Sequence, residues 1–436
     1  MPPVARRTLL ASGAVAAAAP LLASCAEEEP PTLVDRHDYG SAGGDVLVTD
    51  VVVFDGERFT EHDAVAVRGG LVDEVGSGLA AEDLPVFEGG GRVLIPGLID
   101  AHAHQSGWNA RGGLRFGITA MLDMYGGIDT RLDGRADLGE HRYADVWWAG
   151  WGLTVPGGHP TQWFPDAPTV AVTAEVEGFV ADRVSEGSDF LKIVVQRRDF
   201  ASTLSQGEAS AGVEAAHAHG MLAVAHAGGW DDALVAAKAG ADVLVHLPVG
   251  EKPDPEALDL LAERGTPVVA TLTVTSGARC EHDAGVFLED PAIADRLDKY
   301  QRAEADRYPD ACDRRDHDWW REASEASFQA VRNAGLPLLI GTDSGNAPVV
   351  TGVSVFHELE LFAERGVPVE AALAGATSLT ADAFGLGERG RIAPGKRGDL
   401  VLLEASSPEA VIGTYGIAAV WKNGHAVDLE VPEAAR

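Results

Sequence analysis

Between about residues 97 and 385, the chain alternates short apolar runs with amphipathic helical stretches, and this pattern limits the fold more than any other feature. The apolar runs, each a candidate buried strand, are Leu98–Ala101, Ile118–Leu122, Val146–Gly152, Phe190–Val195, Leu222–Ala225, Val243–Val245, Val268–Leu272 and Leu338–Ile340. Strands that are apolar on both faces and alternate with helices are typical of a parallel sheet covered by helices. Eight such units predict an α/β fold, namely a closed (β/α)8 barrel of the TIM type.

Both ends of the chain carry a different pattern, in which short alternating strands are joined by glycine-containing turns. We predict that residues 45–96 and 387–430 form one composite β-domain, a small β-sandwich into which the barrel of residues 97–386 is inserted. The length of 436 residues fits a barrel of about 250 residues with a satellite domain. A polar connection at about 276–318 is unusually long, and we predict a functional loop or lid there.

The first 24 residues predict an export signal that is not part of the fold. Two arginines, Arg6 and Arg7, precede an apolar stretch that is too short to span a bilayer, and this arrangement resembles a twin-arginine signal. Cys25 follows a sequence that resembles a lipoprotein box, although an ordinary secretory signal with an incidental cysteine is the alternative. Residues 25–44 would be a tether, and the protein would be exported and lipid-anchored at the cell surface or on the periplasmic side.

The formal net charge of −33 at pH 7 argues against nucleic-acid binding, which needs a basic footprint. It also argues against adhesion to an anionic membrane, so the lipid anchor is the one predicted membrane contact. The predicted partner is a small-molecule substrate, and the sequence leaves a homo-oligomer open. Cys280 and Cys312 lie in the long connection, where they either form a disulfide in an oxidising compartment or stay two separate thiols.

Polar side chains end four of the eight predicted strands, which is where barrel enzymes place their catalytic groups, and one more lies within the fourth strand. The first strand ends in His102 and His104, and residues two apart in a strand point to the same side. The fourth strand contains Lys192 within its apolar run, and His226, His246 and Asp343 end the fifth, sixth and eighth strands. Taken singly, a strand-end histidine is more often a hydrogen-bonded core residue, and Asp343 could cap a helix.

Lys192 is harder to explain as an ordinary core residue. Of the six lysines in the chain, it is the one inside a strongly apolar run. Burying an unpaired ammonium is costly, and fully buried lysines are rare. The six polar groups on strands one, four, five, six and eight together therefore predict one shared site rather than six unrelated residues.

The order His-x-His, Lys, His, His, Asp resembles that of the binuclear amidohydrolase superfamily. The segment from Val93 to Asp100 resembles the family's approach to the first barrel strand. The segment from Gly390 to Val401 resembles its return to the β-domain, with Gly398 in place of the usual alanine. The resemblance covers nearly everything after residue 44 and is greatest to imidazolonepropionase-like and Xaa-Pro-dipeptidase-like members. It implies a hydrolase of amide-type C–N bonds in a cyclic amide, N-acyl amino acid or dipeptide-like substrate.

The resemblance also implies a role for each strand-end residue. His102, His104 and Asp343 would hold one divalent metal ion, and His226 and His246 would hold a second. Lys192 would be carboxylated to a carbamate and bridge both ions, which nitrogen and oxygen ligands suit if they are zinc or a similar metal. Hydroxide generated at the metals would attack the carbonyl, with Asp343 as the proton shuttle.

Two alternatives stay open. In a mononuclear, imidazolonepropionase-like enzyme, one ion would be bound by His102, His104, His226 and Asp343. His246 would then be catalytic by orienting the carbonyl. The presence of Lys192 argues against this mechanism, because a mononuclear enzyme of this kind uses no lysine carbamate. The other alternative is a non-catalytic, solute-binding surface lipoprotein, which is disfavoured because every ligand position is filled.

Weaker candidates follow the third and fourth strands. His159 ends a glycine-containing segment that resembles a Gly-Gly-His segment of dipeptidase-like relatives. It either binds substrate or is an exposed histidine of a glycine loop. Gln196, Arg197 and Arg198 either bind a substrate carboxylate or begin a solvated helix, and we favour the helix.

Overall fold

The computed structural model of the protein describes residues 43–104, 107–127, 141–197, 202–278, 284–307, 317–346 and 349–435. The export signal of residues 1–24, the tether up to residue 42, lipidation at Cys25, and a disulfide between Cys280 and Cys312 lie outside these residues and stay predictions. Within the described ranges, no helix combines the length and the apolar composition that crossing a membrane requires.

Eight strands in the described part of the central segment pair in parallel and form two sheets. The first sheet contains β5 (Leu98–Ala103), β6 (Ile118–Asp123) and β7 (Asp145–Trp148). The second contains β8 (Leu191–Val195), β9 (Ala223–Ala227), β10 (Val243–Val245), β11 (Val268–Val269) and β12 (Leu338–Leu339). The predicted α/β class is therefore confirmed.

Isolated parallel bridges connect the edges of these two sheets. Ala103 pairs with Ser344 beyond β12, and Leu153 beyond β7 pairs with Ile193 of β8. A backbone hydrogen bond from Ala101 N to the Ile340 carbonyl, 3.0 Å long, supports the first contact. The strands thus succeed one another in chain order, as a parallel barrel requires.

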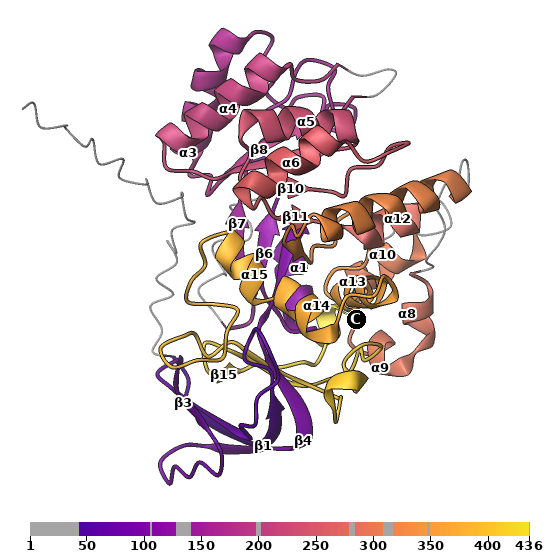
Figure 1. Cartoon of the computed structure of the whole chain (residues 1–436). Helices are drawn as coiled ribbons and strands as arrows, with labels where there is room; N and C mark the ends of the chain where they lie inside the picture. Colours follow the sequence, from indigo (N-terminus) through magenta and orange to yellow (C-terminus); the bar gives the residue numbers. More distant parts are fainter. Residues whose placement is uncertain are drawn as a thin grey trace, which may run out of the picture. The chain divides into compact units, whose positions relative to one another are not determined.

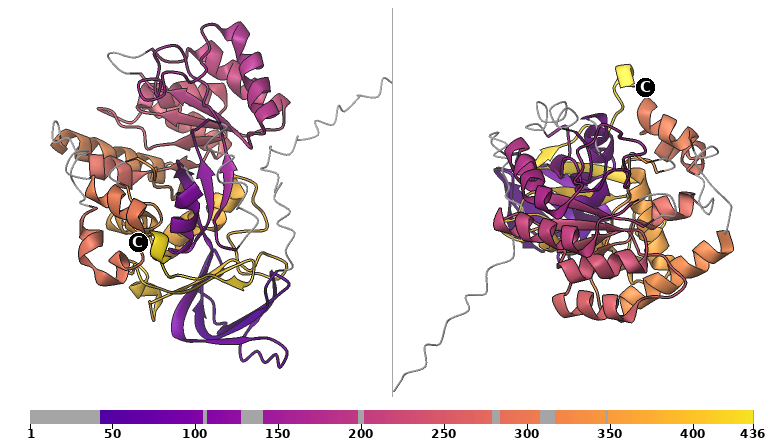
Figure 2. Two further views of the ribbon diagram at one scale, coloured as in Figure 1. Left: turned by 180° about the vertical axis from the view of Figure 1, so that it is seen from behind. Right: turned by 90° about the horizontal axis from the view of Figure 1, so that it is seen from above.

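Helices follow most of these strands. They are α1 (Gly107–Leu114), α3 (Val176–Glu186), α4 (Gln206–Ala218), α5 (Trp230–Ala239), α6 (Pro255–Arg264), α7 (Leu272–Ala278), α12 (His317–Asn333), α13 (Val353–Glu364), α14 (Val369–Gly375) and α15 (Ser378–Ala383), with short 3-10 turns η1 (Thr173–Glu175), η2 (Pro408–Ala410) and η3 (Glu433–Ala435). Figures 1 and 2 show α3 to α6 side by side as one helical layer beside β8 to β10. Local sequence sets their ends, since Ser205 and Glu208 form a capping box at α4 and Gly240 ends α5 in the left-handed region.

The segment at about 276–318 contains further helices rather than one long loop. They are α8 (Val286–Glu289), α9 (Pro291–Ala294) and α10 (Lys299–Asp306). Phe287 of α8 packs on Tyr415 with ring centroids 5.6 Å apart, and Tyr415 also contacts Phe356 of α13. The described part of the segment therefore packs on α13 and on Tyr415, close to the strand β14 (Ile417–Lys422), and its role as a lid stays a prediction.

Strands from both ends of the chain share one sheet. In the described residues this sheet has seven strands in the order β15-β14-β13-β4-β1-β2-β3. Their bounds are β1 (Val46–Val53), β2 (Ala64–Arg68), β3 (Leu71–Gly76), β4 (Val86–Pro96), β13 (Leu400–Leu403), β14 (Ile417–Lys422) and β15 (His425–Ala426). The early strand β4 pairs with the late strand β13 (Figure 1). The arrangement of these strands as a sandwich stays a prediction.

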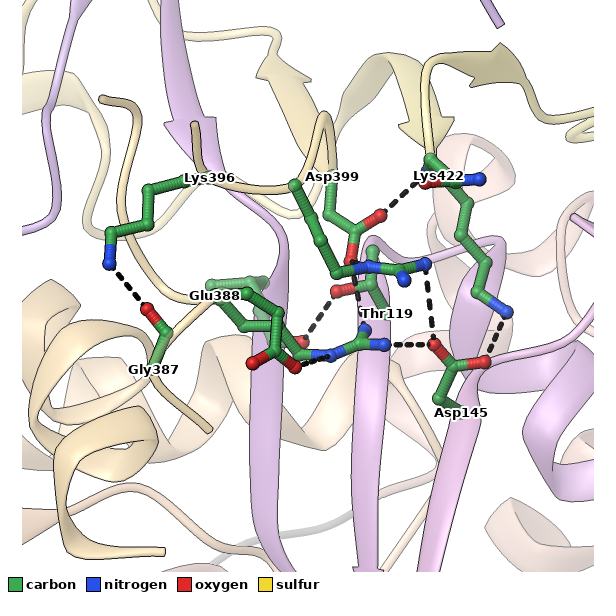
Figure 3. A network of polar contacts seen from close by, with 11 residues as sticks. Thr119, Asp145, Gly387, Glu388, Lys396, Asp399 and Lys422 are labelled. Atoms are coloured by element: carbon green, nitrogen blue, oxygen red, sulfur yellow. Dashed lines mark hydrogen bonds and ion pairs between the residues drawn. The ribbon is translucent and has the colours of Figure 1, made fainter. Parts of the chain in front are cut away.

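A buried charge network joins this sheet to the parallel strands (Figure 3). Asp145, the first residue of β7, is 0% exposed and accepts from Lys422 Nζ and Arg389 Nη2, each at 2.5 Å. Arg389 also donates to Asp399 Oδ2 at 2.9 Å. Burial opposes ionisation of Asp145, but the charges of Arg389 and Lys422 outweigh it and lower its pKa to about 2. Asp399 lies in the return segment from Gly390 to Val401, so Arg389 connects this segment to Asp145 of β7 through ionic contacts.

Candidate active site

The ends of β5 and β12 bring three of the predicted residues together. The Oδ1 atom of Asp343 lies 2.9 Å from His104 Nε2 and 3.3 Å from His102 Nε2. One ligand atom from each residue lies within 4.8 Å of the other two. The pairing of the two chain segments sets this position, since Asp343 N donates to the His102 carbonyl at 2.7 Å. Asp343 has φ 64°, a conformation rare for residues other than glycine and concentrated at functional sites.

The buried Asp100 connects these two strand ends through hydrogen bonds. Asp100 accepts hydrogen bonds from Thr342 Oγ1 at 2.7 Å, Thr342 N at 3.0 Å and His102 N at 3.2 Å. Burial raises the pKa of Asp100 to about 7 despite these bonds. The sequence analysis did not single out Asp100, although an acidic residue between the apolar Ile99 and Ala101 was a visible signal.

His226 and His246 lie beside this group. The ring centroids of His226 and His246 are 4.4 Å apart, and those of His246 and His102 are 4.7 Å apart. The Nδ1 atom of His246 is 2.8 Å from Thr271 Oγ1, and both residues have positive φ, 68° and 48°. Burial lowers the pKa of His246 to about 4, so its imidazole is neutral at neutral pH. The hydroxyl of Thr271 is a second contact that the sequence analysis missed.

Lys192 is the second residue of β8 and is 3% exposed. Its Nζ atom has no hydrogen-bond partner among the residues that the structure describes. Burial lowers the pKa of Lys192 to about 7, while the charges of Asp343 and Asp123 act in the opposite direction. Burial is the main cause that keeps the pKa of His102 well below its ordinary value, and the charge of Lys192 is the second. The amine therefore interacts with the same group of residues that the sequence predicted.

These side chains fit a divalent metal ion. Two imidazole nitrogens and a carboxylate oxygen converge within 4.8 Å, which is a ligand set that zinc and similar ions prefer. His102 Nδ1 and Lys192 Nζ are both buried without a partner in the described ranges. An unpaired buried amine is costly, and a ligand bound to Lys192 Nζ, or a covalent modification of it, would remove that cost. His246 is in ring contact with His102, and His226 is in ring contact with His246, although neither belongs to the three-residue group.

The weaker candidates differ in where they lie. The ring of His159 is 5.1 Å from that of His226, which places His159 at the site. Gln196 Oε1 lies 2.8 Å from His226 Nε2. The guanidinium of Arg197 pairs instead with Asp231 at 3.5 Å, and Arg198 lies outside the described residues.

Comparisons with known proteins agree with this architecture. A family model described as the amidohydrolase family matches residues 93–427. An imidazolonepropionase from Cereibacter sphaeroides is 38% identical over 108 residues, which are 24% of this chain and 27% of that protein. The matched region thus spans about a quarter of the length of this curated relative.

Solved structures match over most of the chain. A Xaa-Pro dipeptidase with bound methionine in its active site has a TM-score of 0.71 and 22% identity, covering 88% of this chain and 100% of that one. A molinate hydrolase has a TM-score of 0.69 and 17% identity, covering 89% and 96%. At these identities the comparison shows a shared fold.

Proposed function

The chain belongs to the amidohydrolase family, and from that premise we propose that it is a metal-dependent hydrolase of amide-type carbon–nitrogen bonds. The convergence of strand-end side chains carries this proposal. His102, His104 and Asp343 are within ligand distance of one another. His246 is in ring contact with His102, and His226 with His246. We also propose that the eight parallel strands close into a (β/α)8 barrel, which the bridges at both sheet edges support.

In this proposal the site would hold two divalent metal ions. His102, His104 and Asp343 would hold one ion, and His226 and His246 a second. A divalent ion, when bound, supplies a Lewis acid that activates water and polarises the substrate carbonyl. The small-molecule substrate would be a cyclic amide, an N-acyl amino acid or a dipeptide-like compound.

Lys192 would bridge the two ions as a carbamate. Its neutral amine would form a bond to the carbon of carbon dioxide and release one proton to solvent, so that the buried neutral amine becomes an anion with two oxygen ligands. A pKa of about 7 makes the neutral amine available at neutral pH. Its burial without a hydrogen-bond partner in the described residues also supports this modification.

Asp343 would move the proton during hydrolysis. Burial raises the pKa of its carboxyl, but the hydrogen bond and charge of His104 reverse this and leave the pKa below its ordinary value. The carboxylate is therefore ionised at neutral pH and can accept a proton from the attacking water and pass it to the leaving nitrogen. Asn346 Nδ2 donates to its Oδ1 at 2.8 Å and orients it.

A mononuclear, imidazolonepropionase-like hydrolase is the second candidate. The curated relative is an imidazolonepropionase, and the group of three close ligands excludes His226 and His246. One ion would then be held by His102, His104, His226 and Asp343. His246, whose Nδ1 is fixed by Thr271, would orient the carbonyl.

Metal content separates the two candidates. Wild-type protein supplied with zinc and bicarbonate should hold two ions per chain, and Lys192→Ala should hold one and lose the mass of one carbon dioxide. Lys238→Ala is the matched control, because Lys238 is a partly exposed lysine paired with Glu256. One ion in both wild type and Lys192→Ala would favour the mononuclear enzyme.

Activity then separates both candidates from a non-catalytic protein. Metal-replete wild type should hydrolyse at least one member of a panel of cyclic amides, N-acyl amino acids and dipeptides. Hydrolysis of none of them by a protein that holds its metal would support the solute-binding alternative.

A further inference from the structure

We propose that the loop after β7 forms one side of a substrate pocket, and that its aromatic side chains select substrates with a flat apolar group next to the scissile amide. We call this surface the aromatic wall and define it as Trp151, Trp163 and Phe164 of this loop together with Tyr125, which follows β6. The inference rests on the proposed hydrolase function, which the experiment below tests separately.

Hydrogen bonds fix the loop that carries the wall. Thr154 Oγ1 donates to the His159 carbonyl at 2.8 Å, and Val170 N donates to the Thr154 carbonyl at 2.9 Å. Thr161 Oγ1 donates to the Gly158 carbonyl at 2.6 Å. The loop is therefore anchored to residues directly after β7, and its aromatic side chains have a defined position before a ligand arrives.

A continuous series of rings leads from the candidate metal ligands to the outer end of the wall. The rings of His226 and His159 are 5.1 Å apart, and those of His159 and Trp163 are 5.2 Å apart at an interplanar angle of 79°. His159 is also held by Gln162, whose Nε2 lies 2.9 Å from its Nδ1. One imidazole thus separates Trp163 from His226.

The inner end of the wall reaches Lys192. Tyr125, Trp151 and Phe164 pack on one another with ring centroids 5.3 to 5.8 Å apart. Gly152 lies against this packing, since a Cβ atom there would be 2.9 Å from Tyr125 Cε2 and 3.3 Å from Lys192 Cγ. The wall therefore extends from the stem of Lys192 to Trp163, along the side of the site that carries His226.

The exposure of the outer rings is the observation that points to a ligand. Trp163 is 62% exposed and Phe164 is 40% exposed, although both are large and apolar. Clustered exposed apolar side chains next to a polar site are typical of ligand-binding surfaces. The cationic Arg197 nearby is already paired with Asp231. A planar apolar group fits this surface because it can stack on the rings and shield them from water.

Two probes that differ in one group test the wall. N-benzoylglycine and N-acetylglycine share the amide and the carboxylate, and only the first has an aromatic ring. Preference is measured as the ratio of kcat/KM for the two probes, or as the ratio of Kd values if neither is hydrolysed. We expect wild type to prefer N-benzoylglycine about tenfold, which is the scale of one ring contact with its burial.

Trp163→Ala should reduce this preference to about one by lowering kcat/KM, or affinity, for N-benzoylglycine more than for N-acetylglycine, and Trp163→Phe should restore part of the preference. Trp319→Ala is the matched control, because Trp319 is a 43% exposed tryptophan on α12. Since Trp163 is exposed, its variants should keep the wild-type thermal midpoint. The proposed role of the aromatic wall is refuted if wild type shows no preference for N-benzoylglycine, or if Trp163→Ala keeps the full preference. Trp163-dependent binding of N-benzoylglycine without any hydrolysis across the amide panel supports the wall and counts against the hydrolase.

Discussion

The Asp145→Asn substitution should destabilise the protein by about 3–5 kcal/mol, because it removes the anion from a buried charge network. Asn keeps the shape of the side chain but leaves Lys422 Nζ and Arg389 Nη2, each 2.5 Å from a carboxylate oxygen in the wild type, without that charge. A pKa of Asp145 lowered from 3.8 to about 2 corresponds to about 2 kcal/mol of favourable ionisation. Burial also lowers the pKa of Lys422, so its amine should release a proton in the variant and keep the loss near the lower end.

Urea denaturation followed by tryptophan fluorescence measures this loss. The matched control is Asp382→Asn, which removes a similarly close pair, since the Asp382 oxygens lie 2.7 Å from Arg391. The Asp382 side chain is 52% exposed, and an exposed pair contributes about 1 kcal/mol or less. The double variant Asp145→Asn/Lys422→Met should be less destabilised than the two single losses added together, because the partners interact directly.

The same network predicts the direction of the pH dependence. Because folding lowers the pKa of Asp145 from 3.8 to about 2, its contribution is present above pH 3.8 and is lost as the pH falls toward 2. The stability difference between wild type and Asp145→Asn should therefore shrink over that interval. If Asp145→Asn lost no more stability than Asp382→Asn, or if the stability difference between wild type and Asp145→Asn did not change with pH, the claim that buried charge stabilises the contact between the two sheets would be refuted.

Two further buried carboxyls give predictions of their own. Glu304 of α10 accepts from Thr351 N at 2.9 Å and Thr351 Oγ1 at 3.2 Å, and burial raises its pKa from 4.5 to about 8. Wild-type stability should therefore fall by about 1.4 kcal/mol per pH unit between pH 4.5 and 8 relative to Glu304→Gln, and parallel stability curves for the two proteins would contradict this. Glu358 of α13 accepts from Leu272 N at 2.8 Å and Thr273 N at 2.7 Å, next to the Thr271 hydroxyl that contacts His246. Glu358→Gln should cost about 1–3 kcal/mol and weaken metal binding about tenfold, with the exposed Glu364→Gln as control, and unchanged metal affinity would argue against a positioning role.

Features set by local sequence could be predicted, and features set by distant partners could not. The two-residue spacing of His102 and His104 suffices to place both imidazoles on one side of β5. The predicted strand Val268–Leu272, in contrast, ends at Val269, and α7 begins at Leu272. Glu358 is far away in the sequence and binds the first backbone amides of α7, so no local pattern specifies this boundary. The helix α10 carried a local signal that was overlooked, because Asp298 and Gln301 form a capping box.

The two buried lysines show why burial alone did not identify the site. The sequence singled out Lys192 as a lysine in an apolar run, yet Lys422 also ends an apolar run, in β14, and both are 3% exposed. Their partners distinguish them. Lys422 donates to the carboxylate of Asp145 at the amino end of β7, where the charge is neutralised and holds two parts of the fold together. Lys192 Nζ has no such partner among the described residues and lies among imidazoles at the carboxyl ends of the strands. A fold retains an unpaired buried charge only where something else compensates for it. The buried lysine without a partner therefore indicates chemistry, whereas burial of a lysine by itself does not.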